Sequence, residues 1–391
     1  MKCEWKSILA KDFIEFNPKI TLKKGTITKK VAMDKVLPYK KYINEFEYAN
    51  YTGGSKFQDG DTIMARITPC LENGKTAFVD FLDENEVGFG STEFIVLRER
   101  KGISDAQYIY YLSISPQFRK IAISSMVGSS GRQRVQQSVL DELELFVPDI
   151  NEQRRIANIL NKIDEKIRIN NRINDNLENF IKNLFKDTFY NNKSNFSYKK
   201  ISLGDLMDYQ GGSQPPSSEF INYKRNGYIR FIQIRDYDSN SHITYIPISS
   251  KNKICNEKDI MIARYGAALG KICCGLNGAY NVALAKVIPR KSFYREFLRN
   301  YLSSKEFYIG INNKGERSAQ SGFNKSDIKS FELLFPKDEK IVIKFEKIAS
   351  NCFELYLKNL KQNRTLENIR NKLLPYLISD KIDISDIELR H

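Results

Sequence analysis

The chain contains an internal repeat, and this feature limits its fold more than any other. The segment Asp61–Arg66 (DTIMAR) recurs as Asp259–Arg264 (DIMIAR), and a Gly-Lys pair follows each copy. Two further matches flank these segments in the same order: Val31–Val36 with Ile232–Tyr237 upstream, and Leu143–Pro148 with Phe331–Pro336 downstream. Because the matches keep their order while their offset drifts slowly, we infer a duplicated unit whose two copies have diverged.

The segments between these anchors differ between the copies. Residues 37–58 share no useful similarity with 238–254, nor do residues 101–134 with 290–320. A framework that is kept while its connecting segments vary is typical of proteins whose loops carry binding specificity.

The sequence pattern of each copy is typical of a mixed α+β domain. Short runs rich in β-formers, separated by turn signals such as Gly53-Gly54, predict strands at 62–67, 77–81, 93–97, 229–234, 260–264 and 283–288. Helical patterns follow at 105–123 and 292–309. We therefore predict two mixed α+β domains, at residues 1–148 and 193–336.

A long helical pattern follows each domain: a central spacer helix at residues 149–192, and a C-terminal spacer helix with a tail at 337–391. Apolar or seam residues alternate at steps of three and four, as in a coiled coil, at Ile156, Leu160, Ile163, Ile167, Asn170, Asn174, Leu177, Ile181 and Leu184, and at Ile341, Phe345, Ile348, Cys352, Leu355, Asn359, Gln362, Leu366, Ile369 and Leu373. Both stripes turn polar in the middle, so an antiparallel pair would bring the polar zones together.

The alternative is two amphipathic helices that pack only on their own domains. Length counts against it, because about 38 helical residues span about 57 Å, more than the diameter of one domain. The predicted fold is thus α+β, with two mixed domains separated by two long antiparallel coiled-coil helices that give the repeat a pseudo-twofold symmetry.

The charge balance indicates a polyanionic partner. Lys and Arg number 62 against 47 Asp and Glu, a formal charge of +15, and each phosphate that a cation neutralises releases counterions. A generally basic surface is the alternative. No run is long and apolar enough for a membrane span, and no Cys-x-x-Cys pair occurs among the six cysteines. We expect a cytoplasmic protein without a metal site or a membrane anchor.

With these features, the chain resembles the specificity subunits of type I restriction–modification systems. The resemblance covers essentially the whole chain and depends on the VPxxxEQRRIA run at 147–157, the Leu203-Gly204-Asp205 start, the Gly211–Pro215 (GGSQP) segment and the two DxxxAR strands. The second copy departs from it with Pro336–Val342 (PKDEKIV), and the first copy has Phe16–Lys19 (FNPK) where the Gly-Gly opening is expected.

The resemblance implies a division of labour. Each domain would read one half of a split, asymmetric target in double-stranded DNA, and the helices would set the gap. Two modification subunits would carry S-adenosylmethionine and the adenine chemistry, and restriction subunits would use ATP and Mg²⁺. This chain would bind no cofactor. A stand-alone DNA-binding or regulatory protein, or an adaptor that docks through its coiled coil, remains the alternative.

The chain lacks the sequence motifs of the corresponding enzymes. Its nearest approach to an adenine methyltransferase loop is Gln214–Ser217 (QPPS), which lacks the aromatic residue, and no Walker-type phosphate loop occurs. We therefore predict no catalytic residues.

The predicted binding residues fall into two sets. Candidates for contacts with DNA are the basic and amide residues of turns and variable loops, because such side chains reach phosphates and base edges: Lys23, Lys24, Lys29, Lys30, Arg66, Arg132, Gln133, Arg134, Lys224, Arg225, Arg235, Arg264, Tyr265, Arg317 and Gln320. Candidates for the helix and partner interface are Glu152, Gln153, Arg154, Ile156, Leu160, Ile163, Ile167, Phe345, Ile348 and Leu355.

Overall fold

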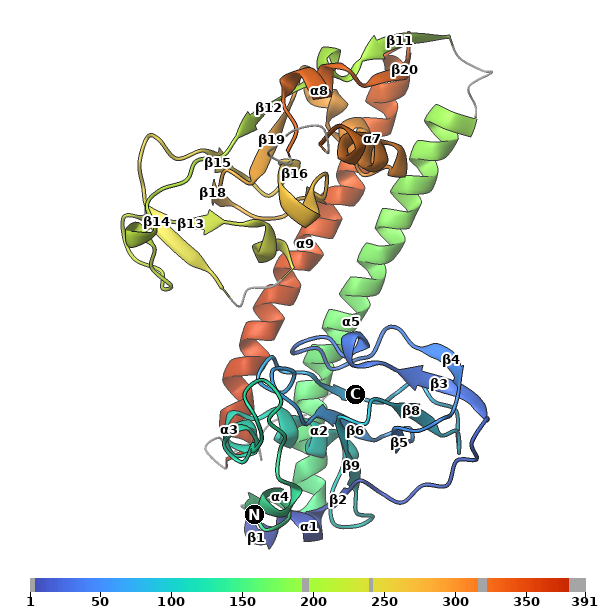
Figure 1. Ribbon diagram of the computed structural model, residues 1–391, viewed down its shortest axis with the longest axis vertical. Coiled ribbons are helices and arrows are strands. Elements are labelled where there is room, and N and C mark those ends of the chain that lie inside the picture. The colour runs from blue at the N-terminus through green and yellow to red at the C-terminus, as the bar shows by residue number, and fades with distance from the viewer. Residues whose placement is uncertain (1–3, 192–196, 239–241, 316–321, 380–391) are drawn as a thin grey trace. The chain divides into compact units, whose positions relative to one another are not determined.

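A computed structural model describes residues 4–191, 197–238, 242–315 and 322–379. The chain forms two compact units (Figure 1). Unit 1 contains residues 1–169 and 363–391, and unit 2 contains residues 170–362. Each unit therefore combines one copy of the repeat with parts of both long helices.

The described residues of unit 1 form three small sheets. The first pairs β1 (Lys6–Leu9) with β10 (Glu144–Val147). The second has the order β2-β9-β6-β7 (Ile14–Phe16, Phe94–Glu99, Thr62–Ala65, Thr76–Phe78), and the third has the order β4-β3-β8-β5 (Glu47–Asn50, Ile27–Val31, Gly88–Gly90, Ser55–Phe57). The only parallel neighbours among these described strands are β3 and β8.

Unit 2 repeats this topology strand for strand. The first sheet pairs β11 (Tyr198–Ser202) with β20 (Glu332–Pro336). The second has the order β12-β19-β16-β17 (Met207–Gly211, Leu284–Pro289, Met261–Ala263, Ile272–Cys273), and the third has the order β14-β13-β18-β15 (Thr244–Pro247, Tyr228–Ile232, Gly278–Tyr280, Ile254–Cys255). Here β13 and β18 are the parallel pair. The predicted duplication is thus confirmed at the level of strand order.

Short helices complete each domain. Their bounds are α1 Ala10–Phe13, α2 Ala106–Ile114, α3 Pro116–Ser124, α4 Gln137–Asp141, α6 Arg295–Leu302, α7 Lys305–Gly315 and α8 Lys325–Lys329. Turns of 3-10 helix lie at Met33–Lys35, Leu203–Asp205, Ser217–Glu219, Ile234–Tyr237, Gly266–Ala268 and Ser292–Tyr294. Both predicted helical stretches are divided in two. In unit 1 the break falls at Ser115, which caps α3 by accepting a hydrogen bond from the Phe118 backbone, with Pro116 at the first helical position.

The two long helices are α5 (Ile150–Lys186) and α9 (Lys340–Leu377). Asp149 caps the start of α5, because its carboxylate accepts hydrogen bonds from the backbone amides of Asn151 and Glu152 at 2.8 and 3.0 Å. A π-helical turn at Asp187–Asn191 ends α5.

The two helices pair in antiparallel fashion through their polar positions. In unit 2, Asn170 donates to Gln362 at 2.9 Å, and Asn359 donates to Asn174 at 2.9 Å. Residue numbers fall along α9 as they rise along α5, as the heptads predict. In unit 1, Asp164 and Arg370 form an ion pair at 2.5 Å with both side chains almost fully buried.

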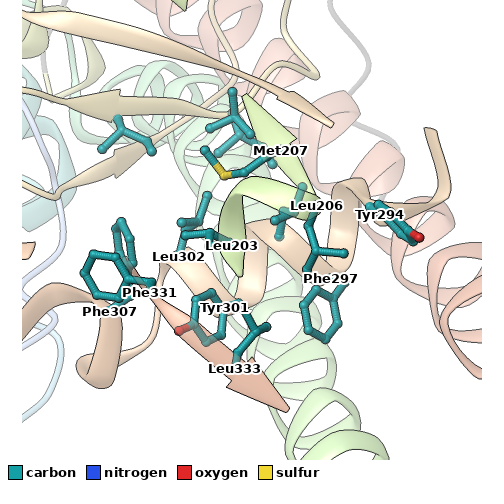
Figure 2. Packing of buried hydrophobic residues seen from close by; sticks show 14 of the residues in the cluster. Leu203, Leu206, Met207, Tyr294, Phe297, Tyr301, Leu302, Phe307, Phe331 and Leu333 are labelled. Carbon is teal, nitrogen blue, oxygen red and sulfur yellow. The ribbon is translucent and has the colours of Figure 1, made fainter. Parts of the chain in front are cut away.

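The core of each unit includes both long helices. In unit 1, Ile156 and Leu160 of α5 share a buried cluster with Leu374 and Leu377 of α9 and with the domain side chains. In unit 2, Phe185 of α5 and Phe345 of α9 lie in the corresponding cluster. Figure 2 shows the domain side of that second core, including Phe297, Tyr301 and Leu302 of α6.

The heptad prediction for α9 is partly wrong. Phe345 is buried, but Ile348 and Leu355 are 43% and 44% exposed. The buried arc instead passes through Ala349 and Phe353. The reason is that α9 packs on its domain as well as on α5: the Arg299 guanidinium of α6 stacks 3.5 Å from the centre of the Phe353 ring.

Candidate nucleic-acid interface

The loop at residues 127–135, which follows α3 in unit 1, is hydrogen-bonded to the end of strand β6. Arg134 forms isolated β-bridges with Ile67 and Val127. The Val135 amide donates to the Arg66 carbonyl at 2.9 Å, and the Thr68 amide donates to the Gln133 carbonyl at 3.0 Å. Arg66 therefore lies at the same sheet edge as Gln133 and Arg134, two other predicted DNA contacts that are distant from it in sequence.

Two glycines shape this loop. Gly128 and Gly131 adopt φ values of +142° and +77°, where side chains are strained. A Cβ on Gly128 would also lie 2.9 Å from the carbonyl oxygen of Arg132. Between these glycines and the sheet, Arg132 is exposed to solvent.

Arg134 is held by a carboxylate that the sequence did not indicate. Its Nε lies 3.0 and 3.1 Å from the two Glu93 oxygens, and its Nη2 lies 2.6 Å from one of them. These bonds raise the pKa of Arg134 and lower the pKa of Glu93, and the neighbouring Arg66 charge lowers the latter further. Arg66 itself is half-buried, and its buried Nε has no hydrogen-bond partner among the described residues.

Unit 2 has the same edge with different chemistry. The Arg66 amide donates to the carbonyl of Glu93, and the Arg264 amide donates to the carbonyl of Ala283, so Ala283 occupies the position of Glu93. The Arg264 guanidinium lies 5.0 Å from the Tyr265 ring and 5.6 Å from the Tyr209 ring. Its Nε is also buried without a partner among the described residues.

Glycine makes room for the Arg264 guanidinium. A Cβ on Gly211 would lie 2.9 Å from Nη1 of Arg264. Next to this edge, Lys325 forms an ion pair with Asp208 at 2.9 Å, which lowers the pKa of Asp208. Sequence reasoning missed Glu93 and Lys325, because neither belongs to a motif. Glu93 reaches the edge by pairing with Arg66, and Lys325 reaches it from helix α8.

One predicted DNA contact in unit 1 is wrong. Lys29 is buried and donates to Glu86 at 2.8 Å and to the Phe81 carbonyl at 3.0 Å. The hydrogen bond to Glu86 raises the pKa of Lys29 and holds its ammonium group inside the domain. Its neighbour Lys30 pairs across the strands with Glu47 at 2.7 Å and is half-exposed. Lys23 and Lys24 are exposed.

The remaining candidates of unit 2 lie apart from the Arg264 edge. Lys224, Arg225 and Arg235 are exposed and flank β13, which belongs to the other four-stranded sheet. Arg225 lies 5.5 Å from the Tyr228 ring. Arg317 and Gln320 lie outside the described residues. The exposed Tyr265 forms a β-bridge with Gly322, next to that loop, as Ile67 does with Arg134 in unit 1.

The predicted interface residues at the start of α5 have different environments. Gln153 is wrong as a partner contact: it is 1% exposed and bonds to the carbonyls of Ile103 and Pro148 and to the Asp105 amide. It ties α5 to the domain. Arg154 is the most open, with its side chain 64% exposed, and Glu152 pairs with Arg155 at 3.2 Å. Ile167 is buried and Ile163 is half-buried.

Metal-binding clusters and membrane-spanning helices are both absent from the described part of the chain. No group of three His, Cys, Asp or Glu side chains among these residues could hold a metal ion. None of the described helices is long and apolar enough to cross a membrane.

Known proteins share this architecture. The family model for the type I restriction modification DNA specificity domain matches residues 3–179 and again residues 196–367. A crystal structure of a type I restriction–modification S subunit from M. genitalium superimposes with a TM-score of 0.58 at 15% identity and covers 96% of each chain. At that identity the likeness shows the fold alone.

Curated relatives match in sequence. The chain is 24% identical over 312 residues to the type I restriction enzyme MjaIX specificity subunit of Methanocaldococcus jannaschii, covering 72% of this chain and 70% of that one. It is 36% identical over 117 residues to the EcoAI specificity subunit of Escherichia coli; this match covers 29% of this chain and spans only 20% of that relative. Because the family model matches both copies of the repeat, the chain belongs to the family of type I restriction modification DNA specificity domains.

Proposed function

We propose that this chain is the non-catalytic specificity subunit of a type I restriction–modification complex. Each domain would read one half of a split target in double-stranded DNA, and the two long helices would set the unread gap. The observation that carries this proposal is a pair of domains with identical strand order whose equivalent edges differ in chemistry, Glu93 standing where unit 2 has Ala283. Two different edges suit an asymmetric target.

The proposal assigns the chemistry to other chains. Two modification subunits would bring S-adenosylmethionine and methylate adenine, and restriction subunits would supply ATP- and Mg²⁺-dependent cleavage. The chain itself would bind none of these cofactors. The cytoplasmic location expected from its cysteine usage stays a prediction.

The test is to map methylated adenines in cells that carry the chain together with its modification subunits. We expect one split motif with two unlike halves and a fixed gap, and we expect the chain to co-purify with the methyltransferase. A chain that binds split sites tightly alone and recruits no methyltransferase would instead support the stand-alone DNA-binding protein.

The net charge of +15 allows a second, independent test. Binding through phosphates releases counterions, so the affinity for DNA should fall steeply as salt rises. An affinity that is insensitive to salt would favour the adaptor that docks through its helices.

A further inference from the structure

The side chain of Arg134 is fixed in advance at an exposed edge of unit 1. Its backbone is bonded on both sides of the loop, since the amides of Arg134 and Val127 each donate to the other's carbonyl, at 2.9 and 3.0 Å. Its guanidinium is fixed by the Glu93 contacts described above. Glu93 is in turn anchored, because its amide donates to the Ser91 hydroxyl at 3.1 Å and its carbonyl accepts from Arg66.

The contact with Glu93 leaves one edge of the guanidinium free. Glu93 occupies the side that carries Nε and one hydrogen of Nη2. The end of the group, with Nη1 and the second hydrogen of Nη2, therefore still presents two parallel N–H donors. The side chain of Arg134 is 45% exposed, whereas that of Glu93 is 23% exposed, so Arg134 is the more open partner.

These donors suit a base edge better than a phosphate. Glu93 neutralises the positive charge of Arg134, and phosphate binding depends on that charge. Because the plane of the guanidinium is already fixed, less conformational entropy is lost when it binds a base. In the major groove guanine presents two acceptors, O6 and N7, which match a pair of parallel donors. Adenine instead presents a donor beside its N7.

We propose that Arg134 reads a guanine in the half-site bound by unit 1, and that Glu93 is the positioning residue that fixes its plane. This inference rests on the proposed function, because it assumes that the edge faces DNA. Unit 2 has Ala283 in place of Glu93 and Gly322 in place of Arg134, so no equivalent pair forms among its described residues, and the second half-site serves as an internal control.

The experiment compares methylated motifs of the complete complex with the wild-type chain and with single variants. In Arg134→Lys a single ammonium replaces the two parallel donors, and we expect at least about a tenfold loss of preference for guanine at one position of one half-site. In Glu93→Gln the arginine remains but is less firmly held, so we expect a smaller loss at the same position. The matched control is Lys120→Gln, an exposed position on α3 of the same unit, which should leave the motif unchanged.

The outcomes separate the two proposals. If the wild-type complex produces no split motif, the proposed function fails. If it does, but Arg134→Lys and Glu93→Gln lower methylation of all first half-sites equally or disturb both halves, then the pair only supports the loop and the inference is wrong. Retention of the second half-site in each variant shows that the chain has folded.

Discussion

At the scale of single residues, burial rather than sequence decides which basic side chains can meet DNA. Lys23, Lys24 and Lys29 lie within one basic stretch, yet Lys29 is enclosed with Glu86 while the first two are exposed. The sequence predicted all three alike. The distinction comes from the fold, because Lys29 lies in strand β3 and is buried, whereas Lys23 and Lys24 precede this strand and are exposed.

We predict that Lys23→Gln with Lys24→Gln weakens DNA binding equally for all sequences. If both contact phosphates, the dependence of log affinity on log salt should become shallower by about 2. Binding titrations at several salt concentrations measure this slope. The matched control is Lys29→Gln, which should lower the free energy of unfolding but leave the slope unchanged. An equal slope in the double variant and the wild type would remove both residues from the interface.

Lys41 is the second residue whose role the sequence concealed. It is 3% exposed and donates to Asn161 at 2.7 Å, to the Tyr111 hydroxyl at 3.1 Å and to Gln107. Burial lowers its pKa to about 8. Nothing in its adjacency to the exposed Lys40 predicts this, because the site forms only when α5 packs on the domain.

This lowered pKa predicts a pH-dependent stability. Below about pH 8 Lys41 is charged in the folded and unfolded states, so the full cost of burying the charge is present. Between that pH and 10.5 the folded state releases the proton while the unfolded state keeps it, so stability rises by up to about 1.4 kcal/mol per pH unit. Denaturant unfolding should therefore show that the free energy of unfolding of the wild type rises relative to that of Lys41→Gln between about pH 8 and 10. Parallel curves for the two proteins would contradict the assignment.

At the scale of elements, the long helices were the most predictable part of the fold. The heptads anticipated both helices and the meeting of Asn174 with Asn359, which are 4% and 7% exposed. The exposure of Ile348 and Leu355 on α9 was less predictable. This helix packs on its domain as well as on α5, so a different set of its residues is buried. Sequence periodicity shows that a face is apolar, but it does not show how many partners share the helix.

The Asn174–Asn359 pair provides a direct test of the helix pairing. Asn174→Leu leaves the buried Asn359 amide without its partner and should cost about 1–3 kcal/mol of unfolding free energy. Leucine at both positions should recover most of that loss, since neither polar group is then left unpaired. In the double variant the two helices should also pair in a less well-defined register, because the polar pair that specifies it is gone. The free energy of unfolding of the single and double variants measures the coupling.

The matched control for this cycle is Asn176→Leu, an exposed position on the same helix. We expect a change within about 0.5 kcal/mol there. Strict additivity of the two single substitutions would show that the pair contributes no coupling.

At the scale of the whole molecule, the division into units does not follow the order of the chain. The domain bounds 1–148 and 193–336 stay a prediction, and the core of unit 1 also contains Leu374 and Leu377 of α9 and Ile378, which follows it. No local pattern in the sequence shows that a C-terminal helix completes an N-terminal domain, because that contact joins residues at opposite ends of the described chain.

We predict that Leu377→Ala destabilises unit 1 by about 2–5 kcal/mol, because this side chain is 3% exposed and its removal leaves a cavity. Hydrogen exchange should accelerate in strands β6 and β9 and change far less in β16 and β19. The matched control is Tyr376→Ala, whose side chain is 50% exposed and should change exchange little. Equal acceleration in both units would mean that they unfold as one body.

The contribution of α9 to unit 1 also has a consequence for biosynthesis. A ribosome makes residues 363–378 only after all of unit 2, so the N-terminal domain emerges first yet waits for its last core residues. During that interval its apolar surface around Ile156 and Leu160 lacks its cover. Translation that stops before this segment would leave both reading domains in the product but only one of them with a complete core.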